Sequence, residues 1–282
     1  SLVVWSTTVG SVLGPNLGAP GQALSERLGM QAFAGPFIIA TLMQLVAAGL
    51  FLFLRPDPLL LASRLQGLEH PIALPNATLP GRRLTEALRT AWRVPAARVA
   101  LVSMCCAHTV MVGVMTMTPV DMEHHGATVT LVGLTISLHV LGMFGLSPLV
   151  GWLSDRFGRV RIIAAGSVTL LVATAVAGTA GMSGGLVMVG LFLLGFGWSL
   201  SMVAASALLT ESVAPQVRTR VQGTVDAAIN ACAAIGAGVS GPLLGIIGFG
   251  GLNTLAAAIV VVGAPFVIIA LRRSTTKVGL AQ

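Results

Sequence analysis

Long apolar runs separated by short polar turns dominate the sequence. A helix of about 20 apolar residues crosses the roughly 30 Å hydrocarbon core of a bilayer, and runs of this length recur from one end of the chain to the other. Eight such runs occur, at residues 2–24, 33–54, 98–120, 129–151, 161–181, 185–209, 221–247 and 250–271. The pattern predicts an all-α polytopic membrane protein with eight transmembrane helices.

Composition supports this class. The chain is 55% hydrophobic and 9% charged, with a mean hydropathy of +0.91, whereas soluble domains carry about 25% charged residues. Its net charge of +7 would suit nucleic acid, but the basic residues are distributed by loop. Fifteen of the sixteen Lys and Arg residues lie in 55–98, 155–161, 218–220 and 272–277, and only Arg27 lies in the alternate loops. The positive-inside rule then predicts that the basic loops and the C-terminus are cytoplasmic. We expect a lipid bilayer around the protein and no nucleic-acid partner.

One long polar stretch, residues 55–97, separates two apolar runs from six. Its six prolines (Pro56, Pro58, Pro71, Pro75, Pro80 and Pro95) predict an extended linker. Within it, residues 82–93 place Leu84, Leu88 and Trp92 one helical turn apart among arginines. This spacing predicts a short amphipathic helix at the inner membrane surface.

A charged turn, GWLSDRFGRVR at residues 151–161, interrupts two apolar runs. It resembles the signature loop of the major facilitator superfamily of secondary transporters, Gly-x-Leu-(Ala/Ser)-Asp-Arg-x-Gly-Arg followed by a further basic residue. The matching residues are Gly151, Leu153, Ser154, Asp155, Arg156, Gly158 and Arg159, with the last basic residue displaced to Arg161.

The resemblance implies a domain organisation. Superfamily members have two six-helix halves joined by a cytoplasmic loop, and each half carries the signature after its second helix. Residues 98–271 are then a complete C-terminal half, 1–54 the last two helices of the N-terminal half, 55–97 the linker and 272–282 a cytoplasmic tail. On this interpretation the chain is a C-terminal fragment that lacks four helices.

The first apolar run carries a second resemblance. Gly10, Gly14, Pro15 and Gly18 match the Gly-x-x-x-Gly-Pro-x-x-Gly-Gly pattern of proton-coupled drug antiporters, with Ala19 in place of the final glycine. Gly10 and Gly14 would form a small surface for close helix contact, and Pro15 would permit a bend. Generic glycine-rich packing is the alternative.

Charged and polar residues near the helix ends have two interpretations. By resemblance, Asp155 with Arg156, Arg159 and Arg161 latches the cytoplasmic side in one conformation. The arginines alone would also serve as positive-inside anchors. Asp226 lies inside an apolar run with Asn230 four residues on, where an acid faces a cavity or a partner. We expect either a proton or gating site, or a structural salt bridge to Arg220 or to the signature arginines.

Within the apolar runs, His108 and His139 are candidates for proton transfer, and hydrogen-bonded packing is the alternative for each. His108 is preferred because its helix corresponds to a cavity-lining helix of the family. Trp198, Ser201 and Met202 are substrate-cavity candidates on another such helix, and they would equally suit packing.

The sequence gives no positive sign of catalysis. Neither a phosphate-binding loop nor a nucleophile elbow nor a His-Glu-x-x-His pair is present. Residues 121–125, DMEHH, have metal-binding side chains, but adjacent histidines do not share a helix face, and a solvated loop is the prediction. We expect no enzyme activity, no metal ion and no cofactor.

The function predicted by resemblance is secondary active transport by alternating access, with proton-coupled efflux of small amphipathic molecules as the preferred form. Its partners would be a small-molecule substrate and protons, in a bacterial inner membrane. The alternatives are an importer of a small metabolite, a redox protein in which His108 and His139 ligate a haem, and a non-transporting receptor.

Overall fold

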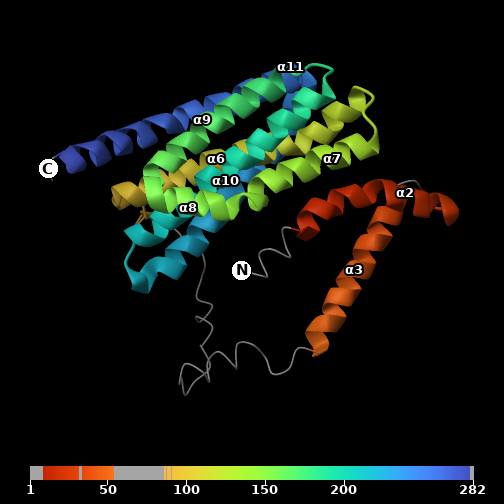
Figure 1. The fold of residues 1–282 in the computed structure, drawn as a ribbon, viewed down its shortest axis with the longest axis horizontal. Coiled ribbons are helices and arrows are strands. Elements are labelled where there is room, and N and C mark those ends of the chain that lie inside the picture. The colour runs from red at the N-terminus through yellow and green to blue at the C-terminus, as the bar shows by residue number, and fades with distance from the viewer. Residues whose placement is uncertain (1–8, 32–33, 54–85, 87, 90, 280–282) are drawn as a thin grey trace. The chain divides into compact units, whose positions relative to one another are not determined.

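The structure is a computed structural model that describes residues 9–31, 34–53, 86, 88–89 and 91–279 (Figure 1). The chain divides into two compact units, one formed by residues 1–16 and 84–282 and the other by residues 17–83. Every regular element in the described part is helical, and six helices there are long and apolar enough to cross a membrane. The predicted all-α membrane fold is confirmed.

The smaller unit contains α2 (Gly18–Arg27) and α3 (Ala34–Phe53). Ser25 joins them, because its hydroxyl accepts a hydrogen bond from the backbone N–H of Gly35 at 2.6 Å. The α3 helix matches the predicted run 33–54 and has a mean hydropathy of 2.1.

The first predicted run, 2–24, is not one continuous helix. Residues 9–13 are helical, the chain then tightens into the 3₁₀ turn η1 (Gly14–Leu17), and α2 follows. Proline has no N–H to donate and its ring clashes with the preceding turn, so Pro15 accounts for the break. Residues 2–8 of this run lie outside the described residues.

The larger unit holds the helices after the linker. They are α6 (Pro95–His124), α7 (Val129–Val140), the π-helical turn η2 (Leu141–Gly145), α8 (Ser147–Phe157), α9 (Arg159–Gly178), α10 (Gly184–Ser212) and α11 (Pro215–Gly279). Together α7, η2 and α8 form one span. Figure 1 shows these helices running side by side, and α10 contacts α6, α7, α8 and α9.

The last two predicted runs, 221–247 and 250–271, join into α11, whose middle is broken at Gly248. There φ is 67° and ψ is 179°, a backbone conformation that side chains other than glycine disfavour. Figure 1 shows α11 turning back on itself, and residues of both its arms line a groove with α6.

Two buried apolar clusters hold this unit together. One includes Ala97, Leu200 and Ile229 and lies toward the signature turn. The other includes Val114, Leu194 and Val260 and lies toward the α6–α7 turn. Both clusters contain residues of α6, α10 and α11. The packing of these three helices therefore positions the functional candidates that they carry.

Most of the predicted linker, including Leu84, lies outside the described residues. Residues 86, 88–89 and 91–93 are helical. Ala91 is buried and Leu88 packs against the first cluster, whereas Trp92 is 46% exposed.

Candidate functional site

The signature turn joins α8 to α9 at Gly158. This glycine has φ 93° and ψ 143° and caps both helices. A residue with a side chain would be strained there, which explains why the turn needs glycine at this position. The result is that Asp155, one turn before Gly158, and Arg159, directly after it, are brought together.

Arg159 is the centre of a polar cluster. It forms an ion pair with Asp155, donates to the Ser154 hydroxyl at 3.0 Å, and donates to a carboxylate oxygen of Glu211 on α10 through Nε at 3.2 Å and Nη2 at 2.8 Å. Ser154 is 1% exposed. The cluster therefore ties the signature turn to the end of α10, and Glu211 is a partner that sequence reasoning missed.

Arg156, Arg161 and Gly151 of the signature turn do not take part in the Arg159 cluster. The Arg156 guanidinium stands 5.5 Å from the centre of the Trp152 ring and 6.0 Å from that of Phe157, in range of a cation–π interaction. Arg161 is exposed, and a side chain at Gly151 would meet open space. Asp155 and Arg159 are thus the pair that the structure brings together.

A second cluster lies near the middle of α6 and α10. The Trp198 indole N–H donates to His108 Nδ1 at 3.0 Å. The Phe144 ring from η2 packs edge-on against Trp198 at 5.8 Å, and the Asn230 side chain of α11 lies beside the same imidazole. Three predicted residues on three helices meet here, and Phe144 is an addition that the sequence did not point to.

Asp226 lies one helical turn before this cluster and is exposed. Asn230 donates to its backbone carbonyl at 2.8 Å. In the described part of the chain, the Asp226 carboxylate forms no ion pair with Arg220 or with the signature arginines. The structural salt bridge considered from the sequence is absent there.

Three other candidates are packed into helix contacts. Ser201 is 1% exposed and lies against Gly166 of α9, and Met202 packs against the first apolar cluster. His139 is fully buried, with Nδ1 2.7 Å from the Leu191 carbonyl of α10. This packing favours the hydrogen-bonded alternative for His139.

The antiporter-like segment packs through its carbonyls. A side chain at Gly10 or Gly14 would meet open space, so the predicted close contact at these glycines is not found among the described residues. Gly133 of α7 instead lies directly against the Pro15 carbonyl, where a Cβ would come within 2.7 Å of its oxygen.

Two side chains complete that contact, and neither was predicted. The Ser137 hydroxyl donates to the Val12 carbonyl at 2.7 Å, and the Asn16 amide donates to the Ser137 oxygen at 2.7 Å and to Val12 at 3.1 Å. The 3₁₀ turn at Pro15 exposes the Val12 carbonyl. The side chains of Asn16 and of Ser137 in α7 donate hydrogen bonds to it.

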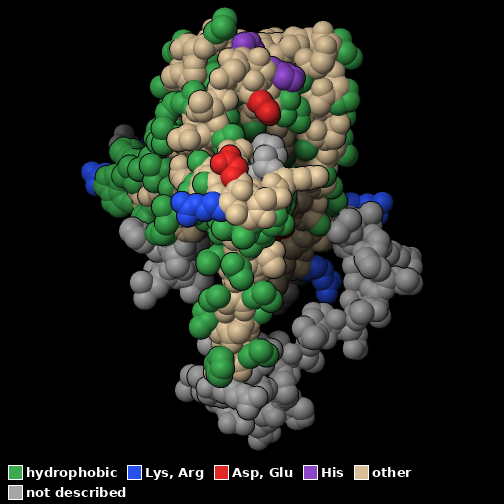
Figure 2. All heavy atoms as spheres, turned by 90° about the vertical axis from the view of Figure 1, so that its right-hand side faces the viewer, with side chains coloured by type: hydrophobic (Ala, Val, Ile, Leu, Met, Phe, Trp, Pro, Cys, Tyr) green, Lys and Arg blue, Asp and Glu red, His purple; other side chains and the backbone are tan. Residues whose placement is uncertain are grey.

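The opposite end of the larger unit carries the DMEHH segment (121–125), whose first four residues end α6 rather than forming the expected solvated loop. His125 Nδ1 lies 2.8 Å from the Asp121 carbonyl and 3.6 Å from its carboxylate. Figure 2 looks onto this end and shows histidine side chains gathered there. Among the described residues, no group of three or more His, Cys, Asp and Glu side chains is arranged to hold a metal ion.

In the described part of the chain, six helices are long and apolar enough to cross a membrane, and they pack around buried clusters. This arrangement defines a multi-pass membrane protein. A family model described as Major Facilitator Superfamily matches residues 100–281. The chain belongs to the major facilitator superfamily.

Curated relatives agree. The chain is similar to the uncharacterized MFS-type transporter YddS of Bacillus subtilis (strain 168), at 34% identity over 98% of this chain and 63% of the relative. It is 35% identical to the uncharacterized MFS-type transporter YdeG of the same organism over 86% of this chain and 56% of YdeG. It is 31% identical to the riboflavin transporter RfnT of Brucella anthropi over 81% of this chain and 53% of RfnT. The chain spans less than two thirds of the length of each.

Proposed function

We propose that this chain is the C-terminal part of a secondary active transporter that exports small amphipathic molecules in exchange for protons. Residues 98–271 form its second six-helix half, 1–54 the last two helices of its first half, 55–97 the linker and 272–282 the tail. The membrane is the bacterial inner membrane, with the basic loops and the C-terminus cytoplasmic. Binding occurs between the halves, and rocking of one half against the other alternates access.

The observation that carries this proposal is the hydrogen bond from Trp198 to His108. It links α6 to α10 near their middles, with the Phe144 ring against Trp198. Aromatic walls with a few hydrogen-bonding groups suit an amphipathic ligand. Histidine changes charge near neutral pH, so the same cluster offers a group for the coupled proton.

The geometry suggests how proton and substrate compete. His108 Nδ1 accepts from Trp198, which requires that this nitrogen carries no proton. Protonation converts Nδ1 into a donor, so the bond to the indole breaks and Trp198 turns its N–H elsewhere. A ligand that needs the neutral, Trp-bonded arrangement is then released as the proton binds, and the two affinities are reciprocally linked.

The test is flux through the full-length protein in proteoliposomes, with ethidium as a flat amphipathic probe and an imposed pH gradient. We expect gradient-driven ethidium movement, and we expect His108→Gln to remove its dependence on the gradient. His124→Gln is the matched control, because His124 is an exposed histidine at the α6–α7 end. Unchanged gradient dependence in His108→Gln would refute the coupling role.

A second candidate function is import of a small metabolite, favoured by the similarity to a riboflavin transporter. Radiolabelled riboflavin offered outside cells that express the full-length protein distinguishes the two. Accumulation above the level of vector-only cells, without ethidium movement, supports import. Ethidium export without riboflavin uptake supports the efflux proposal.

A further inference from the structure

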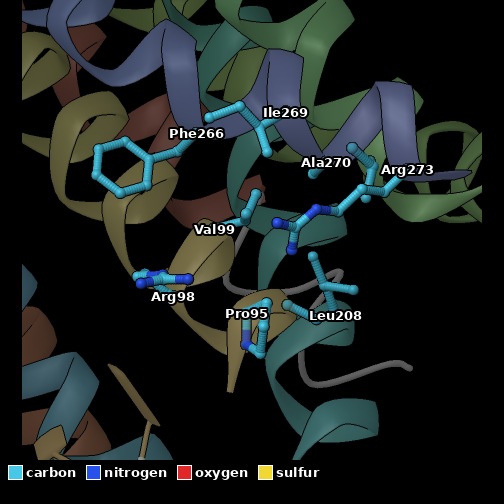
Figure 3. Close-up of a pocket in the computed structure, with 10 residues that line it drawn as sticks. Pro95, Arg98, Val99, Leu208, Phe266, Ile269, Ala270 and Arg273 are labelled. Atoms are coloured by element: carbon cyan, nitrogen blue, oxygen red, sulfur yellow. The ribbon is translucent and has the colours of Figure 1, made fainter. Parts of the chain in front are cut away.

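The larger unit contains a cavity away from the His108 cluster, at the end that carries the signature turn. Its volume is about 380 Å³. The start of α6, the start of α9 and the ends of α10 and α11 enclose it (Figure 3). Its lining combines apolar side chains with two arginines, Arg98 and Arg273.

The two arginines give the cavity a positive charge that the described carboxylates do not cancel. In the described part of the chain, no ion pair joins Arg98 or Arg273 to an acid. The acids of the signature cluster, Asp155 and Glu211, are both engaged by Arg159. Figure 3 shows Arg273 reaching from α11 toward Val99 and Leu208, with Arg98 on α6 below Phe266.

Aromatic residues beside this cavity favour a position near a membrane interface. The Trp92 ring packs edge-on against Phe266 at 6.2 Å, and the Arg98 guanidinium lies 5.7 Å from the centre of the Trp92 ring. Trp92 is 46% exposed. Tryptophan is enriched where head groups meet hydrocarbon, and arginine there extends its charge toward the head groups.

We propose that this cavity binds an anionic phospholipid of the leaflet on the signature-turn side. The phosphate is held between Arg98 and Arg273, because guanidinium forks pair with phosphate oxygens. The first part of an acyl chain lies along Phe266, Val160 and Leu208, all of which line the cavity. A basic pocket between transmembrane helices is a site type that suits lipid head groups.

The apolar walls favour a lipid over a soluble anion. Inorganic phosphate would use the two arginines and leave the Phe266 side of the cavity empty. A neutral lipid would fill the apolar side and leave two guanidinium groups without a counter-charge. An anionic phospholipid satisfies both parts, so head-group charge and acyl chain are each required for binding.

Lipid retention tests the proposal. The full-length protein is purified from nanodiscs of phosphatidylcholine that contain phosphatidylglycerol, and retained lipid is measured by native mass spectrometry. We expect the protein to retain one phosphatidylglycerol. We expect Arg98→Gln/Arg273→Gln to weaken the affinity for this lipid roughly tenfold or more. Arg98→Lys/Arg273→Lys keeps the charge, so it retains more lipid than the glutamine pair. Ala270→Phe keeps both arginines but fills the lining, so it lowers retention too.

The matched control is Arg218→Gln/Arg220→Gln, which removes two exposed arginines outside this lining and should retain the lipid. Equal loss in both double variants would reveal general surface attraction and overturn the site. Displacement by excess inorganic phosphate would show a free-anion site and overturn the lipid assignment. If the glutamine pair unfolds, undiminished retention in Ala270→Phe still overturns the proposal.

Discussion

Two helices of nearly equal hydropathy, α3 and α6, differ sharply in burial. Their mean hydropathies are 2.1 and 1.8, yet in the apolar 18-residue window of each helix none of the α3 residues is buried, whereas 56% of the α6 residues are. The α3 helix ends in large apolar side chains that are almost bare, with Phe51 74%, Leu52 76% and Phe53 87% exposed. In α6, small residues such as Ala97, Ala100 and Ala107 are buried against neighbouring helices.

The contrast between α3 and α6 shows that insertion into a membrane and packing against other helices depend on different properties of the sequence. Lipid is as apolar as leucine, so hydropathy drives insertion but does not bring helices together. Small side chains let helix backbones approach and gain van der Waals contact. Small buried residues therefore explain the packing of α6, whereas the large residues of α3 suit contact with lipid.

The largest expected effect follows from the proposed domain organisation, in which this chain holds only two helices of the first half. We expect the 282-residue chain in proteoliposomes to show no proton-coupled ethidium flux, because two helices cannot supply half of an alternating-access cavity. The full-length protein, reconstituted in parallel, should show it. Gradient-driven flux through these 282 residues alone would refute the proposed domain organisation.

The next effect compares a glycine in each kind of helix. A Cβ at Gly195 of α10 would collide with the His139 carbonyl, whereas one at Gly49 of α3 would meet open space. We expect Gly195→Ala to lower the free energy of unfolding by about 1–3 kcal/mol. Gly49→Ala should change it by less than about 0.5 kcal/mol. Reversible unfolding in mixed micelles measures both, and equal effects would contradict the contrast in packing.

The sequence predicted the positions of helices well where hydropathy alone determines them. The run 33–54 became α3 (Ala34–Phe53), and 185–209 became α10 (Gly184–Ser212). Asp155 and Arg159 are four residues apart, a spacing at which side chains can meet, and the structure joins them in an ion pair. Local spacing was sufficient in both cases.

Pairs distant in sequence were not predictable in the same way. Asn16 bonds Ser137 across 121 positions, and Arg159 bonds Glu211 across 52. Nothing local to Asn16 or Glu211 indicates these partners, because they depend on which helix faces are in contact. The π-helical turn that positions Phe144 was also missed. It lies within a continuous apolar run, so it leaves the hydropathy pattern unchanged.

A smaller effect tests the His108 cluster inside the packed bundle. Trp198→Phe removes the indole donor to His108 and keeps a ring near Phe144. We expect a loss of about 0.5–1.5 kcal/mol in the free energy of unfolding. Trp152→Phe on α8 is the control, because Trp152 is 53% exposed, and it should cost less. A larger loss for Trp152 would indicate that the His108 bond contributes little to the fold.

The smallest effect belongs to the exposed rim of the bundle. Glu211→Gln removes the charge that pairs with Arg159, and the Glu211 side chain is 55% exposed. Solvent screens such a pair, so we expect a loss of about 0.2–1 kcal/mol that shrinks as salt is raised. Glu26 is an exposed acid in α2, so Glu26→Gln is the control and should change nothing measurable.

If Glu211→Gln leaves stability nearly intact but alters ethidium flux in the full-length protein, the pair biases one conformation rather than holding the fold. Equal stability and equal flux would leave Arg159 as an anchor and remove the latch role from the signature turn.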